Sequence, residues 1–192
     1  VNMLDNRSID KKTLEKIISF IRRGNNNSVI LSDFRHGIFN KDTIPSISNS
    51  ISKKIFKAAD SQVANRWGNI CDFKNFDLIT PNEKESRFSL ADQDSTVNSL
   101  SHSLSEVSKA KNIIMKLGEK GVFSISNDKS KRDFFSLDSF TNKVIDPVGA
   151  GDALLAYSTL AMLESKSLVV ASIIGSMAAA FECEIDGNIP VE

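Results

Sequence analysis

Apolar residues recur at helical spacing in five segments of this chain. Helices are predicted over residues 9–23, 42–55 and 95–109, where aliphatic side chains return every three or four positions. Pro45 falls in the first turn of the second of these, where proline is tolerated. Two more helices are predicted over 149–163 and 168–181, and their alanine-rich, aliphatic composition indicates that both lie in the core.

Short apolar runs between these helices predict strands over 28–31, 56–59, 77–80, 112–116 and 122–126. The strand at 77–80 runs into Pro81, so a new element is expected to start at Asn82. Strands that alternate with helices indicate βαβ units and a mainly parallel sheet, with ligands beyond the carboxyl ends of the strands. We therefore expect one α/β domain over residues 1–192.

The balance of charged residues limits the kinds of partner that this chain is expected to bind. The 24 basic residues equal the 24 acidic ones, so there is no uniform field to attract nucleic acid or an anionic membrane, and a small molecule is the expected partner. The apolar run at 168–181 is shorter than the roughly 20 residues that cross a bilayer. No export signal is apparent, so the cytoplasm is the expected location. Cys71 and Cys183 stand apart and are predicted to be reduced thiols.

The segment DPVGAGD, residues 146–152, has the composition of an anion-binding turn. The small residues Gly149, Ala150 and Gly151 let the backbone approach a ligand, and amides at a helix start bind phosphate groups. Asp152, in the first helical turn, could take a proton from a hydroxyl that attacks phosphorus. The alternative is a simple turn with a helix-capping aspartate. The segment matches neither GxxxxGK[ST] nor GxGxxG.

The same segment resembles the signature of the ribokinase-like (PfkB) carbohydrate kinases. In that family the last aspartate is the catalytic base and the Gly-Ala-Gly amides form an anion hole. The resemblance implies these roles for Asp152 and for Gly149, Ala150 and Gly151. It also implies a three-layer αβα fold, with a long apolar helix and a second alanine-rich helix after the motif.

The segment DLITPNEKE, residues 77–85, resembles the family's N-x-x-E motif. The resemblance implies that Asn82 and Glu85 act on the magnesium and phosphate side. Without it, Asn82 is a helix cap and Glu85 completes a capping box. Amide and carboxylate oxygens also suit Mg²⁺, which prefers hard oxygen ligands.

The segment KLGEKGV, residues 116–122, is similar to the family's T-x-G-x-x-G turn on the nucleotide side. This implies that Lys116, Gly118 and Gly121 border the nucleotide, although Lys116 departs from the more frequent threonine. A glycine hairpin turn is the alternative. The last helix and residues 187–190 resemble the adenine side and closing loop, which implies contacts from Ser176, where asparagine is frequent, and from Asn188.

The segment around VILSDFRHG, residues 29–37, resembles a segment of heptose-phosphate kinases, the sugar-kinase half of bifunctional heptose kinase and adenylyltransferase proteins. It implies that Asp33 ends a strand and faces the substrate. Asp60 falls where that subgroup has an aspartate-led loop. Either aspartate could instead cap a turn.

Together these resemblances imply the carboxyl-terminal portion of a ribokinase-like kinase, with the amino-terminal strands and β lid missing. The expected activity is transfer of the γ-phosphoryl group of ATP to a sugar or sugar phosphate, with Mg²⁺. The need for a monovalent cation stays open, and a homodimer would form through the missing lid. Two alternatives remain: a nucleotide-binding module without turnover, and a kinase for a non-sugar alcohol such as a vitamin precursor.

Overall fold

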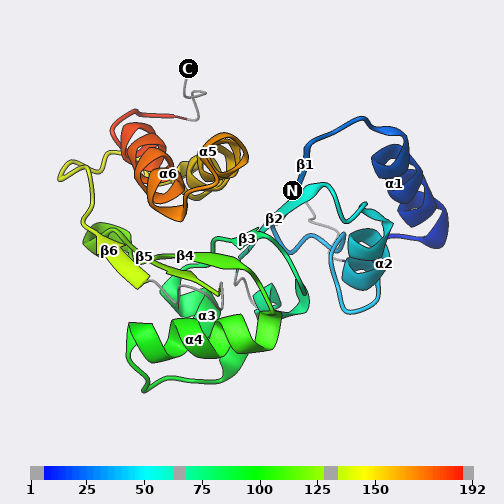
Figure 1. Cartoon of the computed structure of the whole chain (residues 1–192), viewed down its shortest axis with the longest axis horizontal. Helices are drawn as coiled ribbons and strands as arrows, with labels where there is room; N and C mark the ends of the chain where they lie inside the picture. The colour runs from blue at the N-terminus through cyan, green and yellow to red at the C-terminus, as the bar shows by residue number, and fades with distance from the viewer. Residues whose placement is uncertain (1–6, 63–67, 128–133, 188–192) are drawn as a thin grey trace, which may run out of the picture.

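The computed structural model describes residues 7–62, 68–127 and 134–187, which form a six-stranded sheet with helices on both faces (Figure 1). The strands are β1 (Ser28–Asp33), β2 (Phe56–Ser61), β3 (Leu78–Ile79), β4 (Asn112–Lys116), β5 (Val122–Ser126) and β6 (Phe134–Leu137). The helices are α1 (Lys11–Arg23), α2 (Thr43–Ser50), α3 (Glu83–Leu90), α4 (Val97–Ser108), α5 (Ala150–Ser165) and α6 (Leu168–Cys183). Short 3-10 helices lie at Ile70–Asp72 and Gly118–Lys120.

The strands follow one another across the sheet in chain order, from β1 at one edge to β6 at the other. The pairs β1–β2, β2–β3 and β3–β4 are parallel, whereas β5 and β6 join by antiparallel pairing. The expectation of a mainly parallel sheet is confirmed. The carboxyl ends of the first four strands therefore meet at one edge, where ligands bind in open α/β sheets.

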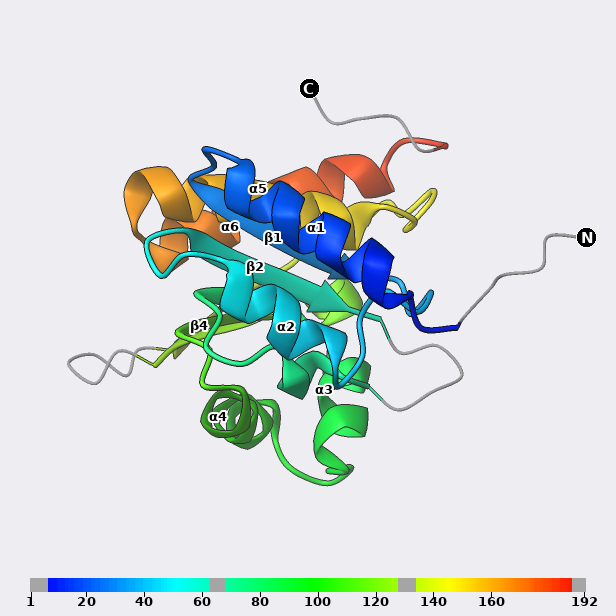
Figure 2. The same ribbon diagram turned by 90° about the vertical axis from the view of Figure 1, so that its right-hand side faces the viewer.

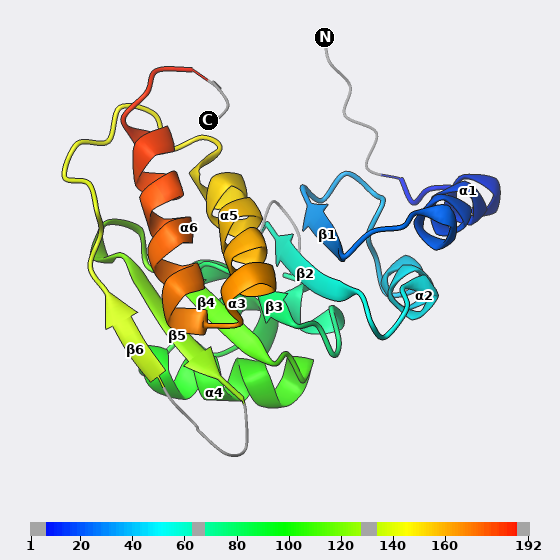
Figure 3. The same cartoon turned by 45° about the horizontal axis from the view of Figure 1, so that its top comes forward.

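Helices cover the sheet in two layers (Figures 1 and 3). The pair α5 and α6 packs on one face through Leu154, Leu155 and Ala171, which join Leu78 and Ile114 of the sheet. The other face carries the larger core cluster, built with residues of α1, α2 and α4. Figure 2 shows α1 and α2 alongside β1 and β2. This confirms the three-layer αβα architecture.

Helices α5 and α6 approach each other closely at Gly175. A Cβ added there would lie 2.0 Å from the Ser158 hydroxyl oxygen and 3.0 Å from the Leu154 carbonyl oxygen. The Ser158 hydroxyl donates to the carbonyl of Ala171 at 3.0 Å. Ser172 of α6 is in turn hydrogen-bonded to Ser124 of β5 at 2.8 Å. Hydrogen bonds therefore join α5 to α6 and α6 to the sheet.

The structure departs from the sequence prediction at several ends. Helix α2 stops at Ser50, and the backbone of Ile51 is extended, so the predicted helix to residue 55 is five residues too long. Strand β6 was not predicted; it is an edge strand whose Phe134 stacks on Phe123 at a ring-centroid distance of 5.8 Å. Cys71 and Cys183 are free thiols, as predicted. Among the described residues, no helix combines the length and apolar character that a membrane crossing requires.

Candidate active site

The glycine-rich turn opens α5 over the sheet. Gly149 has a φ of 91°, a left-handed conformation that favours glycine, and it is the residue that precedes the helix. The Asp146 carboxylate accepts a hydrogen bond from the Val148 amide at 2.9 Å and so shapes the approach to this turn. Ala150 and Gly151 then begin the helix, where amides lack partners within the helix and can bind an anion.

Asp152 lies in the first turn of α5 and meets the carboxyl end of β1. The hydroxyl of Ser32 donates to Asp152 Oδ1 at 3.0 Å. The two residues are 120 positions apart in the chain, so this contact joins the helical layer to the sheet. Asp152 thus stands at the sheet edge where the sequence analysis expects a ligand.

Lys116 and Asp60 form an ion pair beside the same turn. The Lys116 ammonium lies 2.5 Å from Asp60 Oδ2, and both side chains are largely buried. A Cβ added to Gly151 would lie 3.2 Å from Lys116 Nζ and 3.9 Å from Asp60 Oδ2. The ammonium therefore sits next to the start of α5, where its charge adds to the positive end of the helix dipole.

Two buried acidic side chains, Asp60 and Glu85, interact with this ammonium. Burial raises the pKa of Asp60, while the charge of Lys116 lowers it and that of Asp152 raises it further. Burial also raises the pKa of Glu85 to about 7, against the charge of Lys116 and with the charge of Asp60. Lys116 therefore stabilises the charged forms of two buried carboxylates.

Asn82 and Glu85 hold each other in a capping box at the start of α3. The Glu85 amide donates to Asn82 Oδ1 at 2.8 Å, and the Asn82 amide donates to Glu85 Oε2 at 2.6 Å. Among the residues that the structure describes, no hydrogen bond to Glu85 Oε1 accompanies this pair. Within the described ranges, no group of three or more His, Cys, Asp or Glu residues could hold a metal. These donors suit Mg²⁺ that arrives on phosphates with its waters, rather than a complete protein cage.

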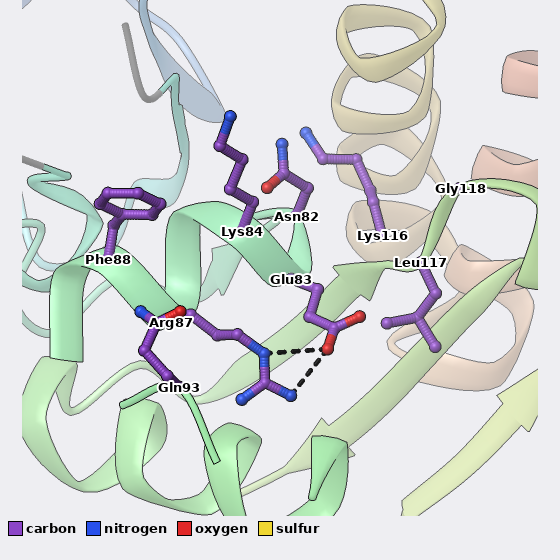
Figure 4. Close-up of a pocket in the computed structure, with 9 residues that line it drawn as sticks. All are labelled: Asn82, Glu83, Lys84, Arg87, Phe88, Gln93, Lys116, Leu117 and Gly118. Atoms are coloured by element: carbon purple, nitrogen blue, oxygen red, sulfur yellow. Dashed lines mark hydrogen bonds and ion pairs between the residues drawn. The ribbon is translucent and has the colours of Figure 1, made fainter. Parts of the chain in front are cut away.

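A cavity of about 370 Å³ lies between α3 and the residues after β4 (Figure 4). Asn82, Lys84 and Lys116 line it and direct their nitrogen atoms to the same side. Arg87 faces away from them and bonds Glu83 at 2.7 Å. Lys84, Lys116 and Asn82 therefore bring two ammonium groups and one amide to the lining of this cavity.

A larger cavity of about 600 Å³ lies between the β4–β5 turn, residues 139–147, and helices α5 and α6. Its lining includes Lys116, Gly118, Gly121 and Ser176, four of the five residues predicted on the nucleotide side. The fifth, Asn188, lies outside the described residues. The Ser176 hydroxyl is buried and forms no hydrogen bond within the described part of the chain.

The turn that closes this cavity requires glycine at one position. Gly121 has a φ of 82°, and a Cβ there would lie 2.0 Å from the carbonyl oxygen of Leu137 on β6. Gly118 also has a positive φ, 62°, but nothing lies within 4 Å of its Cβ position. Gly121 is therefore required by both its backbone conformation and its contact with β6, whereas Gly118 is favoured by its backbone conformation alone.

The aspartate that ends β1 has a different neighbourhood from Asp152. Asp33 Oδ1 accepts from the Arg35 amide at 2.7 Å, and its Oδ2 accepts from Asn69 at 2.8 Å. Ser61 joins this buried network. Asp33 ends its strand as predicted, but its neighbour Ser32 is the residue that contacts Asp152. Sequence reasoning missed Ser32, although the alternation of side chains along a strand could have indicated it.

This fold, with a glycine-rich turn over the carboxyl edge of the sheet, belongs to the ribokinase-like class. Phosphofructokinase-2 from Escherichia coli aligns with a TM-score of 0.77 and 18% identity, over 92% of this chain and 58% of that one. Ribokinase from Thermotoga maritima aligns with a TM-score of 0.73 and 23% identity, over 95% and 57%. Arabidopsis thaliana ribokinase, solved with ribose and ATP, aligns with a TM-score of 0.70 and 19% identity, over 94% and 55%.

The chain belongs to the pfkB family of carbohydrate kinases, whose model matches residues 49–190. It is 30% identical over 168 residues to the bifunctional protein HldE of Helicobacter pylori, across 80% of this chain and 32% of that protein. It is 25% identical over 176 residues to the protein of the same name from Sulfurimonas denitrificans, across 89% and 35%. The chain spans about a third of the length of these relatives.

Proposed function

We propose that this chain carries the nucleotide side and the catalytic base of a kinase that transfers the γ-phosphoryl group of ATP to a hydroxyl of a sugar or sugar phosphate. The observation that carries the proposal is the convergence of the Lys116 ammonium and Asp152 at the start of α5. Membership of the pfkB family and the relative solved with ribose and ATP support it.

The cavity of about 600 Å³ would hold the nucleotide. Gly118 and Gly121 border it on the sheet side, where the absence of side chains lets a ligand lie against the backbone. Ser176 offers a buried hydroxyl without a partner in the described residues, which suits a polar atom of the base. A contact from Asn188 stays a prediction, because this residue lies outside the described ranges.

The amides of Gly149, Ala150 and Gly151, with Lys116, would hold the transferred phosphoryl group. Phosphoryl transfer depends mainly on positioning and on stabilising negative charge, and a helix start with an adjacent ammonium supplies both. Asp152 would accept the proton of the attacking hydroxyl as the new O–P bond forms and ADP leaves. Asp60 remains predicted on the substrate side and would act through Lys116. Asp33 was predicted there too, but it bonds Ser61 and Asn69 on the other face of β1, which does not support a contact with the substrate.

Asn82 and Glu85 would serve Mg²⁺ through its bound waters, since each already bonds the other's backbone amide. When bound with ATP, the ion supplies positive charge to the phosphates. A monovalent cation and a cytoplasmic location stay predictions. The resemblance of residues 29–37 makes a heptose phosphate the first acceptor to test.

Magnesium-dependent ADP release tests the proposal. It is measured with this chain and with the full product of its gene, offered hexoses, heptose 7-phosphate and pyrimidine alcohols. We expect release with one phosphate-bearing or free sugar, abolished by Asp152→Asn, which keeps the shape of the side chain and removes the proton acceptor. Unchanged release in Asp152→Asn would overturn the mechanism, and release with pyrimidine alcohols alone would overturn the substrate class.

A further inference from the structure

We infer that Ser32 is a positioning residue that orients the Asp152 carboxylate towards the acceptor hydroxyl. The inference rests on the proposed function, because orientation of Asp152 matters only if this side chain takes the proton. It gives a role to a serine of the VILSDFRHG segment for which the resemblance implied none.

The contact is placed to orient the carboxylate without blocking it. Ser32 Oγ lies 3.0 Å from Asp152 Oδ1, and Ser32 is half-buried at the end of β1. Asp152 itself is exposed, so its side chain would otherwise sample several rotamers. Oδ2 accepts no hydrogen bond from the part of the chain that the structure describes. One oxygen is thus held by the sheet while the other stays open to receive a proton.

Strand register explains why Ser32, and not Asp33, has this place. Ser32 pairs with Asp60 across β1 and β2, and Asp33 pairs with Ser61. Successive side chains of a strand point to opposite faces. The pair Ser32 and Asp60 therefore lies on the α5 side, whereas Asp33 and Ser61 bond each other and Asn69 on the opposite side.

Ser32 and Asp60, which pair across β1 and β2, each bind one group of the proposed active site. Ser32 holds Asp152, and Asp60 holds Lys116. Both anchors are paired residues of one parallel ladder, so the backbone pairing of β1 with β2 fixes the spacing of the two anchors. Such positioning is worth a substantial rate factor because small displacements of a catalytic group slow the reaction strongly.

The test uses the full product of the gene, with the acceptor that the ADP-release panel identifies. Ser32→Ala is expected to lower kcat about tenfold and to leave the KM for ATP within about twofold, since the hydroxyl touches the base and not the nucleotide. Ser32→Thr keeps a hydroxyl and is expected to restore most of kcat. Ser136→Ala, an exposed serine on β6, is the matched control and should behave as the parent protein.

A double-mutant cycle separates positioning from general damage. In an Asp152→Asn background, Ser32→Ala should change the residual rate by less than about twofold, because the group it orients is gone. A full kcat in Ser32→Ala, an equal loss in the threonine variant, or an additive loss in the double variant would each overturn the inference. Full activity of Asp152→Asn would instead overturn the proposed function.

Discussion

Lys116 reaches across β3 to Asp60. Lys116 ends β4 and Asp60 is the last residue but one of β2; these strands are not neighbours, yet the two side chains meet at 2.5 Å. The intervening strand β3 is only two residues long, Leu78–Ile79. Beyond β3 the chain stays between the two strands, because the Thr80 amide donates to the Ala59 carbonyl and the Lys116 amide donates to the Pro81 carbonyl. The lysine side chain therefore spans this intervening backbone to reach Asp60. The ion pair therefore ties together the carboxyl ends of β2 and β4 at the proposed phosphate site.

Replacing this lysine should harm stability as well as binding. Lys116→Met leaves two buried acidic groups without their cation, and breaking a buried pair on one side costs about 3 kcal/mol. Urea unfolding at about pH 7.5, where lysine is charged, measures the loss in the free energy of unfolding. Lys120→Met, an exposed lysine in the same turn, should change little. Because the double variant Lys116→Met/Asp60→Asn removes both charges, it should recover part of the loss; no recovery would contradict this account.

Glu85 should make the protein less stable as the pH rises. Its pKa is raised from 4.5 to about 7 in the folded state, chiefly by burial. Between these values the folded state binds more protons than the unfolded state, so the free energy of unfolding falls as pH increases through this window. Below about pH 4.5 the stabilising contribution of protonated Glu85 to the free energy of unfolding is fully present, and above about pH 7 that contribution is lost.

Glu85→Gln removes this titration. Urea unfolding without divalent metal, at pH values of about 5 and about 8, should show the variant gaining up to about 3 kcal/mol relative to the parent at the higher pH. Glu119→Gln, an exposed residue, is the control and should follow the parent at both. Parallel pH dependence in the parent and Glu85→Gln would show that this carboxyl does not titrate in the window.

The Ser176 hydroxyl should matter for nucleotide binding and not for folding. It forms no hydrogen bond in the described residues, so Ser176→Ala is expected to change stability by less than about 0.5 kcal/mol. If the hydroxyl bonds the base, the Kd for ATP should rise by up to about tenfold. Ser172→Ala is the converse control, since it leaves Ser124 unpartnered and should lower stability without changing the Kd. An unchanged Kd in Ser176→Ala would remove this residue from the nucleotide site.

The two glycines of the β4–β5 turn should respond differently to alanine. Gly121→Ala combines a φ of 82° with a Cβ 2.0 Å from a backbone oxygen of β6, so we expect a loss of about 3 kcal/mol or more. Gly118→Ala meets open space and carries only the left-handed backbone penalty, about 1 kcal/mol. Thermal unfolding of both variants measures the difference. Equal losses would mean that contact with β6 does not explain the requirement at Gly121.

The local sequence pattern predicted the helices and strands better than it predicted the contacts between them. Strands β4 and β5 have the predicted bounds, and α5 and α6 differ from prediction by one or two residues at their ends, because their periodic apolar residues and flanking glycines act locally. Strand β6 was missed because four residues at a sheet edge carry little alternation. The 3-10 helix at Ile70–Asp72 had no signal in the pattern.

The site was predicted in its parts and not in its connections. The DPVGAGD segment indicated the turn and Asp152, and the structure places both over the sheet edge. The pairing of Lys116 with Asp60 joins two strands that are not neighbours, and 56 residues separate the partners, so no local spacing encodes it. The contact of Ser32 with Asp152 likewise follows from which face of β1 each residue occupies.

Strand β1 ends the sheet on one side and pairs only with β2 among the described strands. Its outer backbone groups form a row of donors and acceptors, and Ile30 within it is 39% exposed. Such a row is a template on which another extended segment can add by backbone hydrogen bonding. The chain would therefore present an unpaired strand edge next to Ser32, which contacts Asp152. A further strand that paired with β1 would lie beside the proposed catalytic base.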